Sequence, residues 1–172
     1  MNTVGSLAPA GATSSASSLG ERARRRLMRE LQRMRRSGVQ AGIAATLPDE
    51  HNVMRWHATI HGPEDTPYAG AVLPLELRFA NDYPRTPPDV RFTCAMFHPN
   101  VYENGRVCIS ILDRDWSPEM TAEKVLVSLR SLLAEPNPDS PANIDAGALL
   151  RNDRDAYMAK VIATLYDANC LE

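Results

Sequence analysis

Cys108 lies in a stretch that shows neither helical nor strand-like periodicity, between residues 99 and 120. An unpatterned stretch of this length inside a globular domain is typical of a functional loop. Asn100 and Asp113 are among its polar residues. A cysteine in such a loop is either a small buried hydrophobe or a nucleophile, and the frequency of buried cysteines alone favours the first role. The chemistry that the neighbouring residues can support decides between the two roles.

Three chemistries can be tested against these residues. No metal site is predicted, because Cys94, His98 and Cys108 lack a second closely spaced pair of ligands. A cysteine hydrolase would need His98 as the base for Cys108, and this alternative stays open. A thioester carrier would hold an acyl group on Cys108 and pass it on. The carrier makes smaller demands, because a thiol with a pKa of about 8.5 is already partly ionised at neutral pH.

A carrier needs help at two steps. The sequence has no G-x-x-x-x-G-K-[ST] loop for ATP, so another enzyme would have to activate the acyl group. An acceptor lysine with a pKa of about 10.4 is less than about 1% neutral at pH 7, and it must lose a proton before it attacks. The tetrahedral intermediate then needs a donor for its oxyanion, and the side-chain amide of Asn100 can supply one.

An amphipathic first helix is predicted from apolar residues at helical spacing, which are Ala23, Leu27, Leu31 and Met34. A capping box of the form S-x-x-E starts at Ser18, and Gly38 stands where a helix C-cap is expected. Residues 21–36 contain eight arginines and two glutamates, a local charge of +6 in a chain whose net charge is only −2. This basic stretch predicts an acidic partner, with nucleic acid among the possibilities.

The rest of the chain predicts a sheet followed by helices. Alternating apolar residues and turn signals mark four strands, at residues 43–47, 54–60, 73–79 and 90–93. Helices are expected from Ser117-Pro118 to Glu135 and around Tyr157–Leu165. The predicted class is α+β, with an N-terminal helix, a four-stranded antiparallel β-meander, the cysteine loop and C-terminal helices.

The length and composition predict one globular core domain. Residues 1–19 are expected to be a disordered Ser/Ala-rich tail, and residues 169–172 a short C-terminal end. No apolar run approaches the roughly 20 residues of a membrane span. The number of cysteines is odd, at three, and the N-terminus lacks the pattern of a secretory signal. Reduced thiols and a cytoplasmic or nuclear location are therefore expected.

The residues around Cys108 carry a family resemblance. The run from Phe97 to Leu112 reads FHPNVYENGRVCISIL, in which the cysteine follows the histidine of H-P-N by ten residues. Four further blocks agree in order and spacing, and they begin at His61, Asn81, Trp116 and Glu135. On these motifs the chain resembles the ubiquitin-conjugating enzymes over residues 20–168, and the resemblance implies the same fold as the periodicity.

The resemblance implies a role for each residue near Cys108. Cys108 would accept ubiquitin as a thioester, and Asn100 would steady the oxyanion or the loop. His98 and Pro99 would hold the H-P-N turn. Ser140 stands where many members carry an acid beside the acceptor lysine. The adjacent Asp139 could replace that acid, or phosphorylation of Ser140 could supply the charge.

The resemblance also implies where partners bind. The first helix, with Arg22, Arg25 and Arg29, would contact an acidic surface of the ubiquitin-activating enzyme. Ubiquitin ligases of the RING or HECT type would contact two loops, which carry Pro84, Arg85, Pro118 and Glu119. Many members have a large apolar residue at position 85 and a small residue at 119, so unusual ligases are expected here.

The expected enzyme is a monomer that acts on a protein substrate. It would bind no cofactor, because ATP is used by the activating enzyme, and it would need neither nucleic acid nor a membrane span. Three alternatives remain: a conjugating enzyme for a SUMO-type or NEDD8-type modifier, a non-catalytic variant of the same fold, and the unrelated cysteine hydrolase. The presence of both Cys108 and Asn100 disfavours the non-catalytic variant.

Overall fold

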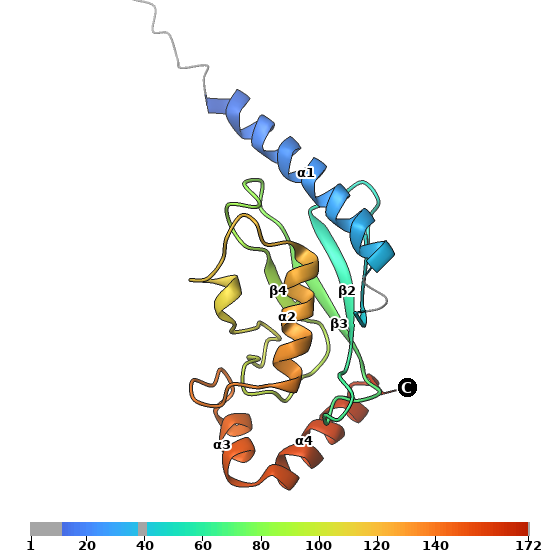
Figure 1. The fold of residues 1–172 in the computed structure, drawn as a ribbon, viewed down its shortest axis with the longest axis vertical. Helices are drawn as coiled ribbons and strands as arrows, with labels where there is room; N and C mark the ends of the chain where they lie inside the picture. The colour runs from blue at the N-terminus through green and yellow to red at the C-terminus, as the bar shows by residue number, and fades with distance from the viewer. Residues whose placement is uncertain (1–11, 38–40, 172) are drawn as a thin grey trace, which may run out of the picture.

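The computed structural model describes residues 12–37 and 41–171 (Figure 1). Its elements follow one another in the order α1 (Ala12–Ser37), β1 (Ile43–Thr46), β2 (Arg55–His61), β3 (Val72–Arg78), β4 (Asp89–Phe92), the short 3-10 helix η1 (Ser110–Leu112), α2 (Ala122–Ala134), α3 (Ile144–Asn152) and α4 (Arg154–Asp167). The predicted α+β class and all four predicted strands are confirmed. None of the helices in these described ranges combines the length and apolar character of a membrane-spanning helix.

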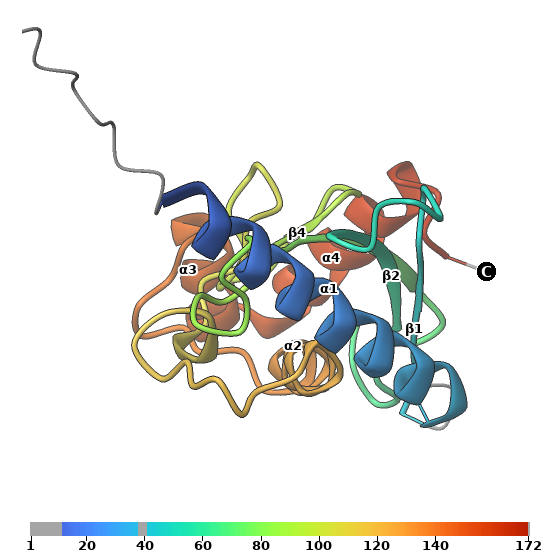
Figure 2. The ribbon, with the colours of Figure 1, turned by 90° about the horizontal axis from the view of Figure 1, so that it is seen from above.

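The four strands form an antiparallel meander in the order β1-β2-β3-β4. Buried and exposed residues alternate along β2, where Trp56, Ala58 and Ile60 point into the core. Helix α2 covers this buried face, with α1 at one end of the molecule and α3 and α4 at the other (Figure 1). Figure 2 looks down on the first end and shows α1 running diagonally across it. The two ends are therefore separate surfaces, and each can bind a different partner.

Helix α1 buries the predicted stripe, which consists of Ala23, Leu27, Leu31 and Met34. It begins at Ala12, so the capping box expected at Ser18 lies inside the helix and does not start it. Extending an existing helix by further turns costs little compared with nucleating one, so Ser- and Ala-rich residues can continue it. Residues 1–11 of the expected tail and the expected C-cap at Gly38 lie outside the described residues.

The C-terminal helices differ from the expectation in two places. Helix α2 begins at Ala122 with Thr121 as its N-cap, and the Thr121 hydroxyl accepts a hydrogen bond from the Lys124 N–H at 3.2 Å. Ser117, the expected cap, instead begins a turn in which its carbonyl accepts from the Met120 N–H at 2.9 Å. Helix α3 was not predicted from periodicity at all, whereas the end of α2 at Ala134 and the position of α4 agree with the prediction.

Candidate active site

The loop that carries Cys108 folds back on itself through short-range hydrogen bonds. The Cys108 N–H donates to the Asn100 carbonyl at 2.8 Å, and the Gly105 N–H donates to the Tyr102 carbonyl at the same distance. Gly105 has a φ of +83°, and a Cβ there would lie 2.1 Å from the Phe92 carbonyl oxygen, so this turn requires glycine. The Cys108 side chain is exposed and free. The thiol is thus presented to solvent on a backbone fixed against Asn100.

His98 is completely buried beneath this loop. Its Nδ1 accepts a hydrogen bond from the Asn100 N–H at 2.9 Å, so Nε2 carries the proton and donates to the Leu132 carbonyl at 3.1 Å. Burial lowers the pKa of His98 to about 4, although the hydrogen bond to Leu132 opposes this shift. Both ring nitrogens are engaged, which leaves His98 unavailable as the base that a cysteine hydrolase would need.

The Asn100 side chain joins the cysteine loop to the loop between α2 and α3. Its Nδ2 donates to the Asn137 carbonyl and its Oδ1 accepts from the Asn137 N–H, both at 2.8 Å. The residue is only 3% exposed, yet it also lines the cavity beside Cys108. A side-chain amide has two N–H bonds, so the second remains after the bond to Asn137 is made. Asn100 can therefore hold the loop and offer a donor to a reacting carbonyl.

A cavity of about 880 Å³ brings Cys108, Asn100 and Ser140 together. Asp139 is exposed but is not among the residues that line this cavity, and its N–H donates to the Asn137 Oδ1 at 3.0 Å. Pro99 is buried in the turn below the cavity. Ser140, rather than the neighbouring aspartate, therefore lines the cavity that contains the thiol.

The expected partner-binding residues fall into three groups. Arg29, Pro118 and Glu119 line one groove of about 420 Å³ between α1 and the loop before α2. Arg22 and Arg25 are exposed on α1 but do not line it, and Arg25 pairs with Glu21 at 3.7 Å. Beside the groove is a second loop, which carries Pro84 and the exposed Arg85. The Trp116 indole N–H donates to the Pro84 carbonyl at 2.9 Å and ties the two loops together.

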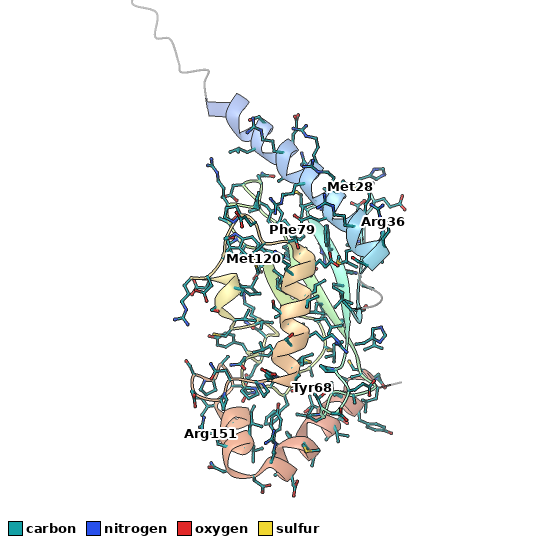
Figure 3. The ribbon with its side chains drawn as sticks, viewed as in Figure 1. Met28, Arg36, Tyr68, Phe79, Met120 and Arg151 are labelled. Carbon is teal, nitrogen blue, oxygen red and sulfur yellow. The ribbon has the colours of Figure 1, made fainter. Side chains whose placement is uncertain are left out.

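Glu30 was not anticipated, although it is central to this end of the molecule. Its carboxylate accepts from the Tyr83 hydroxyl at 2.9 Å, from the Ala122 N–H at 2.9 Å and from the Arg26 guanidinium at 2.7 Å. Arg26 also donates to the carbonyl of Met120, which Figure 3 labels beside the start of α2. Burial, followed by the nearby Glu30 charge, raises the pKa of Tyr83. An acidic residue on the apolar stripe of α1 is the signal that could have revealed this role.

Within residues 12–37 and 41–171, no three His, Cys, Asp or Glu side chains gather in a way that could hold a metal ion. The prediction of a site without metal ligands concerns the whole chain and is not decided by this finding.

Comparison with known proteins shows which family this chain is similar to. The sequence pattern of the family described as "Ubiquitin-conjugating enzyme" matches residues 26–165, a range that includes Asn100 and Cys108. The chain is 46% identical over 140 residues to ubiquitin-conjugating enzyme E2 3 of Arabidopsis thaliana, which covers 81% of this chain and 92% of that relative. It is 45% identical over 143 residues to ubiquitin-conjugating enzyme E2 2 of Saccharomyces cerevisiae, covering 83% of this chain and 82% of the relative.

Proposed function

Because the chain belongs to the ubiquitin-conjugating enzyme family, we propose that Cys108 accepts ubiquitin as a thioester and transfers it to a lysine of a protein substrate. One observation carries this proposal: an exposed, free thiol stands at a cavity that is also lined by the fixed amide of Asn100. An adduct of protein size requires an accessible sulfur, whereas Cys94 is half-buried and Cys170 is buried.

The proposed reaction has two steps, and each exchanges one bond. In the first, the Cys108 thiolate attacks the ubiquitin thioester on the activating enzyme, and that enzyme's thiol leaves. In the second, the neutral lysine amine attacks the carbonyl on Cys108. An amide bond forms, the C–S bond breaks, and the amine proton passes to solvent or to a group in the cavity. The free N–H of Asn100 would stabilise the oxyanion between these bond changes.

The proposal also assigns the residues that act on the acceptor lysine. Ser140 lines the cavity but has a neutral hydroxyl, whereas Asp139 has a carboxyl group and lies one residue away. We assign Asp139 the role of orienting the lysine and accepting the proton that its ammonium group loses, with a phosphate on Ser140 as an alternative acceptor.

The exposed arginines of α1 support the proposal that an activating enzyme binds this helix with an acidic surface of its own. The groove at Pro118 and Glu119, with the neighbouring loop at Pro84 and Arg85, is proposed as the contact for RING or HECT ligases. The enzyme would act as a monomer in the cytoplasm or nucleus and without nucleic acid. It would use no cofactor of its own, since ATP is spent by the activating enzyme.

Ubiquitin is the proposed modifier, rather than a SUMO-type or NEDD8-type protein, because the relatives are named ubiquitin-conjugating enzymes. The chain should be incubated with ATP and each modifier together with its own activating enzyme. We expect an adduct with ubiquitin that a thiol reductant removes. Cys108→Ser should give a reductant-stable ester instead, and Cys170→Ser should behave as wild type. An adduct with another modifier alone, or cleavage of a ubiquitin conjugate without ATP, would contradict the proposal.

A further inference from the structure

A second groove, of about 570 Å³, adjoins the catalytic cavity on the side of α3. One wall is the turn at residues 102–104 and the other is the segment at residues 142–145, which contains the first residues of α3. Tyr102 and Asn104 line both the groove and the cavity that contains Cys108. A chain that enters the cavity from this side must therefore pass along the groove.

Both walls are fixed relative to Cys108. The turn is closed by hydrogen bonds from the Gly105 N–H to the Tyr102 carbonyl and from the Tyr102 N–H to the Arg106 carbonyl, at 2.8 and 2.9 Å. The other wall is tied to the H-P-N turn, because the Asn143 N–H donates to the Pro99 carbonyl at 3.0 Å. Preorganised walls reduce the entropy that a bound segment costs.

The groove exposes apolar surface that the fold itself does not use. Ile144 is 74% exposed and Tyr102 is 46% exposed, although isoleucine is among the residues most often buried. Ile144 is the first residue of α3. The buried residues of that helix are Ala146 and Gly147, and Leu149 and Leu150 also pack against the core. The exposed isoleucine therefore offers contact area to a partner instead of packing within the chain.

The groove also carries negative charge. Glu103 and Asp145 line it, and neither carboxylate has an ion-pair partner among the described residues. The nearest arginine of the cysteine loop, Arg106, is already paired with Asp89 at 2.7 Å. Asp145 in the first turn of α3 also interacts favourably with the helix dipole. That interaction does not explain the acidic residue at position 103.

We propose that this surface, which we call the acceptor groove, binds the substrate residues that flank the acceptor lysine. It selects a lysine with one basic and one apolar neighbour. This inference rests on the proposed function, since it describes how the same cysteine chooses its acceptor. An extended peptide advances about 3.3 Å per residue, so side chains within about three positions of the lysine reach a groove that begins where the cavity ends.

The test measures single-turnover discharge of the preloaded thioester to four peptides, each with one lysine. Beside the lysine, the first carries arginine and leucine, the second glutamate and serine, the third arginine and serine, and the fourth glutamate and leucine. We expect the wild type to prefer the first peptide over the second by roughly five- to tenfold, since partly exposed ion pairs and one apolar contact contribute modestly. The double variant Glu103→Gln/Asp145→Asn should bring the preference for the basic neighbour close to one, and Ile144→Ala should remove the preference for leucine.

Matched controls come from exposed residues elsewhere. Asp155→Asn alters the first turn of α4 as Asp145→Asn alters that of α3, and Ile162→Ala shortens another exposed isoleucine. Both controls should keep the wild-type preference, and discharge to free lysine should stay unchanged in every variant. An unchanged preference in the groove variants would overturn the inference alone. Slower loading or slower discharge to free lysine would also overturn the inference, because the groove would then bind ubiquitin or the activating enzyme. Absence of any thioester would overturn both the inference and the proposed function.

Discussion

The two ends of the molecule are built in different ways. At the catalytic end, Cys108, Asn100 and His98 lie within eleven residues and are joined by hydrogen bonds between neutral groups, and neutral contacts with Leu132 and Asn137 tie them to other parts of the chain. The docking end is assembled from three distant segments, α1 and two loops, which meet at the buried carboxylate of Glu30. The catalytic end is held by several separate contacts, whereas three contacts of the docking end share the one carboxylate of Glu30.

The largest effect is expected at the docking end. Glu30→Ala would leave Arg26, the Tyr83 hydroxyl and the Ala122 N–H without their shared acceptor, so the free energy of unfolding should fall by about 3 kcal/mol. Chemical denaturation measures this change. Glu21→Ala is the matched control on the same helix, where the exposed pair with Arg25 should contribute less than about 0.5 kcal/mol. Equal losses in the two variants would remove the distinction between the ends.

Acidification tests the catalytic end, because His98 is held there in its neutral form. Burial lowers its pKa to about 4, below the value of about 6.5 expected in the unfolded chain. The unfolded chain then binds more protons between these values, so stability should fall by about 3 kcal/mol as the pH drops from about 6.5 to 4. Denaturation curves across this range measure the loss. His98→Gln should flatten the pH dependence and the exposed His57→Gln should not, and equal curves for both variants would contradict this account.

Substitution of Asn100 should slow discharge of the thioester much more than its loading. Asn100→Ala removes the proposed oxyanion donor and both contacts with Asn137, so discharge to free lysine should slow about 100-fold. Loading should change far less, since the backbone bond from Cys108 to the carbonyl of residue 100 is retained. Single-turnover assays measure both rates, with Asn81→Ala as the control, because Asn81 is exposed and does not line the cavity. Equal slowing of the two steps would leave Asn100 only a structural role.

The smallest effect concerns the exposed arginines of α1. Reversing Arg25 and Arg29 to glutamate should slow thioester loading about tenfold and weaken its dependence on salt, because complementary charge mainly raises association rates. Loading rates at several salt concentrations measure the effect. The control is reversal of Arg151, which lies at the opposite end of the molecule (Figure 3). If loading is unaffected in the double variant, these arginines form only a solvated helix face and do not bind the activating enzyme.

The same contrast explains what could be predicted from the sequence. The strands and the buried stripe of α1 were found because their burial follows a period of two or 3.6 residues. The site around Cys108 was found because its residues are contiguous. Glu30 was missed because two of its partners lie 53 and 92 residues away, in Tyr83 and Ala122. The start of α2 was misplaced at the same point, since Glu30 accepts from the first N–H of that helix.

Helix α3 was missed for a different reason. It has nine residues, of which only Ala146 and Gly147 are buried, while Leu149 and Leu150 are partly buried and Ile144 is exposed. Its core-facing apolar residues span little more than one turn, which is too short for a stripe of period 3.6 to stand out. Its start is instead set by the Asn143 side chain, which accepts from the Ala146 N–H at 3.0 Å, and by the bond from the Asn143 N–H to Pro99.

The identity of the acceptor atom is tested most directly by a chain in which Cys108 is the only thiol, the double variant Cys94→Ser/Cys170→Ser. Its intact mass should be measured after incubation with ubiquitin, activating enzyme and ATP. The account predicts one added ubiquitin, at the summed mass less one water, formed at the wild-type rate and lost on addition of thiol reductant. Failure of this variant to load, with a reductant-sensitive adduct retained in Cys108→Ser, would contradict the assignment of Cys108.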